Sequence, residues 1–124
     1  MNTAYLLVML TFNAAGQGEL SFVATESQQQ CQIKGQVVAG ILSSAGIETR
    51  EKRCIQTSMQ FSPFKHTEQG SKQPAYQYRA RFTADAVEIT PVTDLHSCRK
   101  TSKHKNNAQE RIYCAASSQK MLSR

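Results

Sequence analysis

The sequence lacks any long hydrophobic segment, and it contains few aromatic residues. The longest apolar run, residues 5–10, is far shorter than the roughly 20 residues that cross a bilayer, so no membrane span is expected. Tryptophan is absent and aromatic residues make up 7% of the chain, whereas 40% of its 124 residues are hydrophobic. This length and composition are typical of one soluble globular domain with a modest core.

Recognisable catalytic motifs are also missing. The chain has no glycine-rich phosphate loop, no His-Glu-x-x-His, no Gly-x-Ser-x-Gly and no Cys-x-x-Cys. Its three histidines, His66, His96 and His104, lie in polar segments that we expect to be exposed. The sequence therefore predicts a protein that is not an enzyme, and it indicates no cofactor.

Charge is divided unequally between the two halves of the chain. Residues 1–62 hold four basic and four acidic residues, whereas residues 63–124 hold eleven basic and five acidic ones. The whole net charge of +6 thus belongs to the second half, and an acidic partner should bind there. The candidate basic patch comprises Arg79, Arg81, Arg99, Lys100, Lys103, Lys105 and Arg111.

This patch has two interpretations. Several of its residues share neighbouring faces of a predicted helix, and such a surface can neutralise phosphates in a salt-dependent way. Tyr76 and Tyr78 alternate with Arg79 and Arg81, as in surfaces that stack nucleic-acid bases. The alternative is an ordinary solvated face that keeps the protein soluble.

Two parts of the chain show the same order of signals, about 70 residues apart. In each part a strand ends in phenylalanine, at Phe12 and Phe82, and turn-forming residues follow. An acidic residue then leads an alternating strand, at Glu19 and Glu88, and a threonine precedes a cysteine. This order predicts two tandem units, each with two strands, a helix and a strand.

The first unit is predicted over residues 1–61. Its strands are expected at 5–12, 19–24 and 54–61, with a helix over 26–45 that is capped by Thr25 and stopped by Gly46. The apolar positions that form one helical stripe and should face the core are Cys31, Val38, Ile41, Leu42 and Ala45.

The second unit is predicted over residues 75–117, after a polar linker at 62–74. Its strands are expected at 75–82, 87–91 and 112–116, and its helix, over 94–105, is short and weakly apolar. Residues 118–124 are expected to form a loose tail.

The four cysteines are the strongest chemical signal. Cys31 lies in the first predicted helix and Cys54 at the start of the strand after it, and Cys98 and Cys114 take matching places in the second unit. Because a helix can pack on its own following strand, we expect one disulfide per unit, each contributing about 3 kcal/mol. The alternative is four reduced, buried thiols in a reducing compartment.

A zinc site is a further interpretation of the second unit. His96, Cys98, His104 and Cys114 are ligands of suitable type. Their spacing matches no standard zinc finger, and residues two apart on a helix point in different directions. We therefore expect surface histidines beside a disulfide and no bound metal.

The N-terminal segment allows two interpretations that bear on localisation. Residues 4–12 resemble the apolar core of a secretory signal, with Ala14-Ala15-Gly16 as a small-residue cleavage site, but no basic residue precedes them. The same residues also fit a buried strand followed by a turn over 13–18, and this interpretation agrees better with the second unit. The paired cysteines leave a periplasmic or secreted location open.

One resemblance concerns the first half alone. An apolar N-terminal strand, a glycine-containing turn, a second strand, the segment Thr-Glu-Ser-Gln-Gln-Gln-Cys at 25–31 and a second cysteine at 54 resemble small uncharacterised bacterial and prophage proteins. The resemblance covers residues 1–61 and implies a strand–turn–strand–helix–strand unit with a cysteine pair. It also favours an N-terminal hairpin over an export signal, and it implies no activity.

Together these patterns predict a single α+β domain in which two tandem ββαβ repeats form an antiparallel sheet with two helices on one face. The expected function is that of a small non-enzymatic binding protein, an inhibitor or accessory factor of bacterial or phage origin that acts through protein–protein contacts. The alternative is a nucleic-acid-binding module that uses the basic patch.

Overall fold

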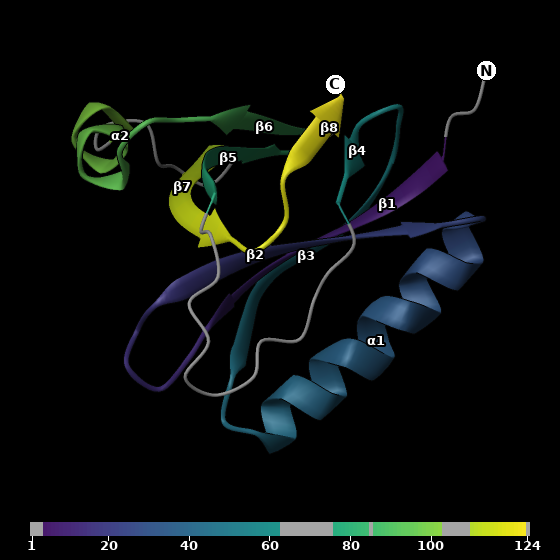
Figure 1. Cartoon of the computed structure of the whole chain (residues 1–124). Helices are drawn as coiled ribbons and strands as arrows, with labels where there is room; N and C mark the ends of the chain where they lie inside the picture. Colours follow the sequence, from purple (N-terminus) through teal and green to yellow (C-terminus); the bar gives the residue numbers. More distant parts are fainter. Residues whose placement is uncertain (1–3, 63–75, 85, 103–109, 124) are drawn as a thin grey trace.

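The chain adopts a mixed α+β fold, seen here in a computed structural model that describes residues 4–62, 76–84, 86–102 and 110–123 (Figure 1). These residues form a six-stranded sheet, a two-stranded sheet and two helices. The strands are β1 (Ala4–Phe12), β2 (Gly18–Thr25), β3 (Glu48–Thr57), β4 (Gln60–Phe61), β5 (Tyr76–Thr83), β6 (Val87–Pro91), β7 (Glu110–Ser117) and β8 (Met121–Ser123). The helices are α1 (Gln28–Ser44) and α2 (Leu95–Ser102).

The large sheet has the strand order β3-β1-β2-β7-β5-β6. The first half of the chain supplies three adjacent strands and the second half the other three, all antiparallel to their neighbours within each half. Between the halves, β2 and β7 run parallel through one registered pair, Glu19 and Ala116. The prediction of an antiparallel sheet is therefore wrong at this junction, because β2 and β7, the strands at which the two halves meet, run in the same direction.

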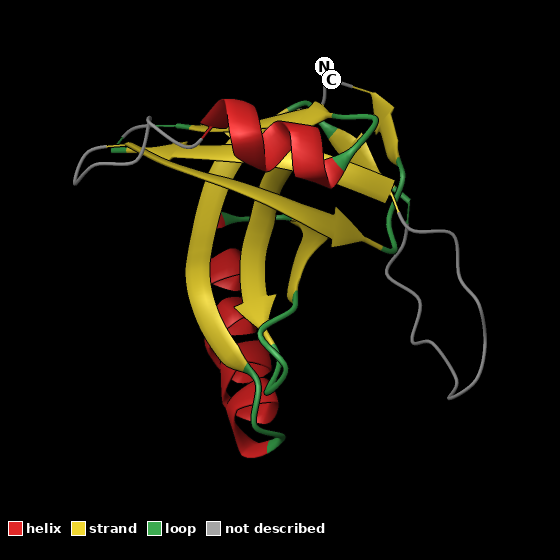
Figure 2. Ribbon diagram, turned by 90° about the vertical axis from the view of Figure 1, so that its left-hand side faces the viewer, coloured by secondary structure: helices red, strands yellow, loops and turns green. Residues whose placement is uncertain are grey.

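The main core lies between the two halves, because the sheet is strongly curved (Figure 2). Leu6, Val8 and Leu10 of β1 pack in one buried cluster with Tyr78 and Phe82 of β5, although β2 and β7 separate these strands in the sheet. The alternate residues of β1 point to the opposite face. β1 is thus buried on both faces, which explains its continuous apolar sequence. Residues 4–12 form a strand, as the second of the two interpretations predicted.

Helix α1 covers the outer face of the first half. Cys31 packs in a second buried cluster with Leu7 and Met9 of β1, and Val38 and Leu42 lie against it. A Cβ atom added at Gly35 would lie 3.2 Å from Leu7 Cδ1. The helix therefore approaches the sheet closely at this glycine, which a larger residue would prevent.

The ends of α1 differ slightly from the prediction. Ser27, not Thr25, is the N-cap, and its hydroxyl accepts a hydrogen bond from the Gln30 backbone N–H. The Gln30 side chain accepts one in turn from the Glu26 N–H, so two backbone donors are satisfied. Thr25 is unsuitable because its hydroxyl donates to the Tyr5 carbonyl within the sheet. Gly46, at φ +80°, ends the helical segment as predicted.

Helix α2 is short and contacts mainly β7. It begins after Asp94, whose carboxylate accepts hydrogen bonds from the backbone N–H groups of His96 and Ser97. Hydrogen bonding, chiefly from Ser97, lowers the pKa of Asp94 and keeps this cap charged. The prediction placed the helix over 94–105, of which 103–105 lie outside the described residues, as do residues 63–74 of the predicted linker.

Strand β3 begins at Glu48, six residues before the predicted start, so Cys54 lies well inside it. Four of the five residues in its first half are charged, which conceals the strand pattern. Glu51 is nevertheless buried, with 8% of its surface exposed, because it finds polar partners across the core. Such polar pairing is a property of the tertiary structure that a hydrophobicity pattern does not contain.

The C-terminal segment is not a loose tail over residues 118–123. β8 pairs with β4, and Gln119 is buried with 1% of its surface exposed. Its side-chain amide donates to the carbonyls of Phe22 and Ser62 and accepts from the Phe22 N–H. Tyr78 Oη also donates to the Gln119 carbonyl. These bonds fasten the segment over one end of the core, because each buried polar group needs a partner.

Candidate functional site

The predicted cysteine pairing is confirmed. Cys31 is at disulfide distance from Cys54, and Cys98 from Cys114, with Cα–Cα separations of 6.0 and 6.1 Å. Each pair joins a helix to the strand that follows it. Because Cys98 and Cys114 bond to each other, the alternative zinc site loses two of its four ligands, and His104 lies outside the described residues.

The described members of the basic patch do not all lie on one face. In the pairing of β5 with β7, Phe82 lies opposite Arg111, and Arg79 lies opposite Cys114. Opposed residues share a face, so Arg111 is on the core side while Arg79 and Arg81 are on the side that carries α2. Lys103 and Lys105 lie outside the described residues.

Two members of the patch are neutralised by carboxylates. Arg81 forms ion pairs with Glu88 and Glu110. The guanidinium of Arg111 donates two hydrogen bonds to the carboxylate of Glu51. All three partners lie on other strands, and Glu110 and Glu51 are also distant in sequence from the arginines that they contact. Charge counting along the chain therefore does not find these pairs.

The remaining three members, Arg79, Arg99 and Lys100, are exposed. Within the described part of the chain they form no ion pair with an acidic side chain. Arg99 and Lys100 stand in the last turn of α2, where positive charge is favourable. Among the described members of the patch, three of five thus remain without an acidic partner.

A polar cluster joins the two halves at the edge of the core. Tyr113 Oη donates to Glu51 at 2.8 Å, beside the Arg111 pair, and Arg53 donates to the Thr83 carbonyl at 2.8 Å. Burial favours a higher pKa for Glu51, but hydrogen bonds from Arg111 and Tyr113 and nearby positive charges outweigh it and lower that pKa. Glu51 stays ionised, and the cluster fastens β3 to β7 rather than forming an open reaction site.

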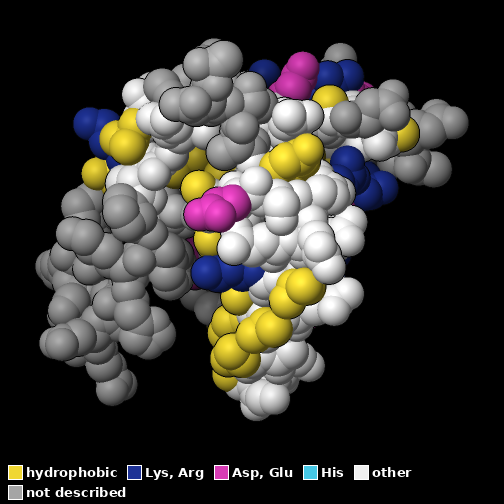
Figure 3. Space-filling model, turned by 90° about the vertical axis from the view of Figure 1, so that its right-hand side faces the viewer, with side chains coloured by type: hydrophobic (Ala, Val, Ile, Leu, Met, Phe, Trp, Pro, Cys, Tyr) yellow, Lys and Arg dark blue, Asp and Glu magenta, His cyan; other side chains and the backbone are white. Residues whose placement is uncertain are grey.

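The most unusual surface is the outer side of α1. Ile33, Val37 and Ile41 are 55%, 56% and 64% exposed and follow one another at intervals of four residues. We call these three residues the α1 outer stripe. In Figure 3 hydrophobic side chains form a continuous line over the part of the surface where α1 lies. Single exposed apolar residues are common on soluble proteins, whereas a contiguous row of them is unusual.

The sequence interpretation missed this stripe and misplaced one of its members. Ile41 and Ala45 were predicted to face the core, but both are exposed, whereas Val38 and Leu42 lie against the buried cluster. The signal was present, because apolar residues surround α1 on more than the one side that a single sheet face can cover.

A shallow hollow runs beside the stripe. It has a volume of about 510 Å³ and is lined by Ser27, Gln29, Gln30, Ile33, Lys34, Val37 and Val38. Lys34 is the one charged residue among the 17 of α1, and the other exposed polar residues of the helix are glutamines and serines. The stripe and the hollow thus form an apolar surface with an almost uncharged border.

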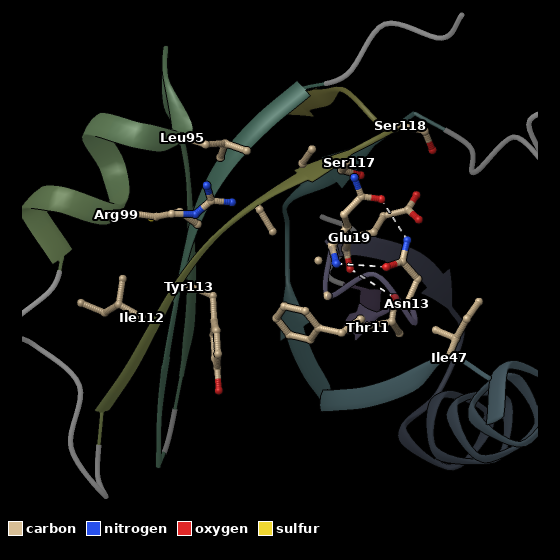
Figure 4. A pocket seen from close by; sticks show the side chains of 17 residues that line it. Thr11, Asn13, Glu19, Ile47, Leu95, Arg99, Ile112, Tyr113, Ser117 and Ser118 are labelled. Carbon is tan, nitrogen blue, oxygen red and sulfur yellow. Dashed lines mark hydrogen bonds between the residues drawn. The ribbon is translucent and has the colours of Figure 1, made fainter. Parts of the chain in front are cut away.

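A second hollow, of about 950 Å³, lies where β2 and β7 diverge (Figure 4). Leu95, Arg99 and Ile112 line one side of it, and Glu19 and Ile47 line the other. The surrounding chain withdraws the Glu19 carboxyl from part of its water and raises its pKa. The described lining holds no histidine, and its single cysteine, Cys114, is disulfide-bonded. It offers opposite charges to a ligand but no nucleophile paired with a base.

Neither helix in the described part of the chain combines the length and the apolar character that crossing a bilayer requires. The described residues also contain no group of three or more histidine, cysteine or acidic side chains that could hold a metal ion. No family model, no curated protein and no solved structure matches this chain.

Proposed function

We propose that this protein is a small non-enzymatic binding protein, and that the outer side of α1 is the surface that contacts its protein partner. The observation that carries the proposal is the α1 outer stripe, a row of apolar side chains that are more than half exposed on a helix whose other side is packed on the sheet. An amphipathic or apolar helix from a partner can bury such a row.

The scaffold supports this role. α1 is joined to β3 by the Cys31–Cys54 pair and packs on Leu7 and Met9 of β1. A surface held this rigidly loses little conformational freedom on binding, which favours affinity. An inhibitor or accessory factor acts through such a fixed surface, and a bacterial or phage origin is part of the same proposal.

Affinity capture from an extract of the source cells tests this role. The comparison uses the wild-type protein, a Val37→Glu variant and a Gln32→Glu variant. Gln32 is exposed on α1 but lies outside the stripe, so the Gln32→Glu substitution adds the same negative charge at a different place on the helix. Partners retained by the wild type and by Gln32→Glu, but lost by Val37→Glu, support the proposal. The same proteins retained by all three contradict it.

Nucleic-acid binding is a second candidate, favoured by the three exposed cations Arg79, Arg99 and Lys100. A surface of this kind contacts phosphates without sequence preference, and its affinity falls as salt rises. Retention of DNA or RNA at low salt that disappears in an Arg99→Glu, Lys100→Glu variant supports this function. A wild-type protein that retains neither nucleic acid at low salt contradicts it.

We also propose that the two halves are copies of one ββαβ unit with both helices on the same face of the sheet. The support is the strand order, which is third-first-second in both halves, and the matching place of each cysteine pair. Glu19 lies on the face of the first half that α1 covers, and Ala116 lies on the face of the second half that carries α2. Because these two residues are paired neighbours at the junction, the two faces are continuous. An experimental structure whose halves superimpose strand for strand supports the proposal, and helices on opposite faces would contradict it.

A further inference from the structure

We infer that the occupant of the α1 outer stripe is a second copy of this chain, giving a dimer in which the α1 helices of two molecules cross at their outer sides. This inference rests on the proposed function, because it names the partner of the same surface. It follows from the shape of the stripe, from the hollow beside it and from the distribution of charge.

The first argument is the spacing within the stripe. Ile33, Val37 and Ile41 are each four residues apart, so they form a ridge that is inclined to the helix axis. When two helices pack ridges of this kind into each other's grooves, their axes cross at about −50°. Two identical ridges of three residues satisfy this geometry with Val37 at the centre.

The second argument is self-complementarity. A twofold contact requires one surface patch to fit against itself, so each molecule must offer both a ridge and a groove. On α1 the ridge lies directly beside the hollow, because Ile33 and Val37 of the ridge also line the hollow. Gly40 stands next to the ridge, and a Cβ atom added there would meet nothing within 4 Å. A second helix can therefore come close to the backbone at this point.

The third argument is charge. Two molecules that each carry a net charge of +6 repel one another, and the contact that meets least opposition is the one with fewest charges. The outer side of α1 is such a surface, since Lys34 is the single charged residue of the helix. An acidic partner protein would be attracted to Arg79, Arg99 and Lys100 instead.

The same charge argument disfavours a lipid surface as the occupant. Helices that lie on membranes place lysines and arginines along their polar face, where they contact anionic headgroups. α1 has glutamines and serines at those positions and one lysine. A neutral polar border of this kind suits the rim of a protein interface, where amide side chains exchange hydrogen bonds with a partner or with water.

Sedimentation velocity over a range of protein concentrations tests this inference with the full-length chain. The wild type is expected to shift from monomer to dimer as concentration rises. Val37→Glu places two like charges at the centre of the contact and is expected to weaken self-association by about tenfold or more, as for a central interface residue. Gln32→Glu, which adds the same charge elsewhere on α1, is expected to dimerise like the wild type.

Covalent trapping keeps the test decisive if Val37→Glu fails to fold. Under mild oxidation a Val37→Cys variant should give a disulfide-linked dimer, because residues at a twofold axis face their own copies, whereas Gln32→Cys should not. A wild type that stays monomeric at every concentration overturns the inference, as does equal trapping of both cysteine variants. A monomeric wild type that still captures a partner through Val37 would overturn the dimer alone and leave the proposed function standing.

Discussion

The two helices cover the same sheet in different ways. α1 has 17 residues and lies over a buried apolar cluster that includes Leu7, Met9 and Cys31. α2 has 8 residues, and Cys98 is the buried residue among its described side chains. Each helix carries one disulfide, but the buried clusters of the described residues include side chains of α1 and none of α2. We therefore expect the disulfide to supplement packing in the first half and to replace it in the second.

The largest effect is expected from the core that both halves share. Phe82→Ala removes a fully buried ring that packs with side chains of β1, and it should lower the free energy of unfolding by about 3–5 kcal/mol. Because this core lies between the halves, both should unfold together. Denaturant curves followed by near-UV and far-UV circular dichroism should coincide, and two separate transitions would contradict a shared core.

Removing each disulfide should have different local effects on α1 and α2. Replacing either pair with alanines should cost about 3 kcal/mol, since the closed loops differ little in length, at 23 and 16 residues of separation. Hydrogen exchange of the helix amides should distinguish the two variants. The α2 amides should lose protection without Cys98–Cys114, whereas the α1 amides should stay protected without Cys31–Cys54 because α1 also packs on the sheet. Equal loss in both helices would show that α1 also depends on its disulfide.

The pairing itself can be checked on the unmodified protein. Because every cysteine of the described structure is bonded, titration of the denatured, unreduced protein with a thiol reagent should find close to no free thiol. Four reactive thiols would refute the pairing, and two would show that one helix is not fastened in this way.

A smaller effect is expected at the polar cluster between the halves. Glu51→Gln should lower the free energy of unfolding at neutral pH by about 2 kcal/mol, because charged hydrogen bonds from Arg111 and Tyr113 are weakened. The folded protein holds the pKa of Glu51 below its ordinary value of about 4.3. The stabilisation is thus fully present above that value and is lost as pH falls through the lower folded pKa.

Denaturant midpoints of the wild type and of Glu51→Gln should therefore differ at neutral pH and converge as the solution is acidified below about pH 4. A difference that is independent of pH would indicate that the carboxylate charge of Glu51 does not fasten the halves.

The smallest effect is expected on the other face of β5. Arg81 pairs with Glu88 and Glu110, but its side chain is partly exposed and solvent screens these pairs. Arg81→Gln should therefore leave the free energy of unfolding almost unchanged. If Arg81→Gln lowered the free energy of unfolding as much as Glu51→Gln does, the greater burial of Glu51 would not explain the strength of its ion pair.

The sequence predicts those parts of the fold that depend on local pattern. The β1–β2 hairpin, both helices and the cysteine pairs follow from alternation, helical spacing and position in the chain. The buried Glu51, the Gln119 hydrogen bonds and the parallel contact of Glu19 with Ala116 depend on partners distant in sequence. The outer stripe was missed for a related reason, since which apolar side of α1 faces the sheet is decided by tertiary packing.

The central claim is that α1, and not α2, offers the protein-binding surface, and that a second copy occupies it. Amide chemical shifts of isotope-labelled protein over a dilution series test this most directly. The account predicts that shifts around Ile33, Val37 and Ile41 change with concentration while those of α2 stay constant. Shifts that stay constant throughout the chain, or that change on α2 and not on α1, would contradict it.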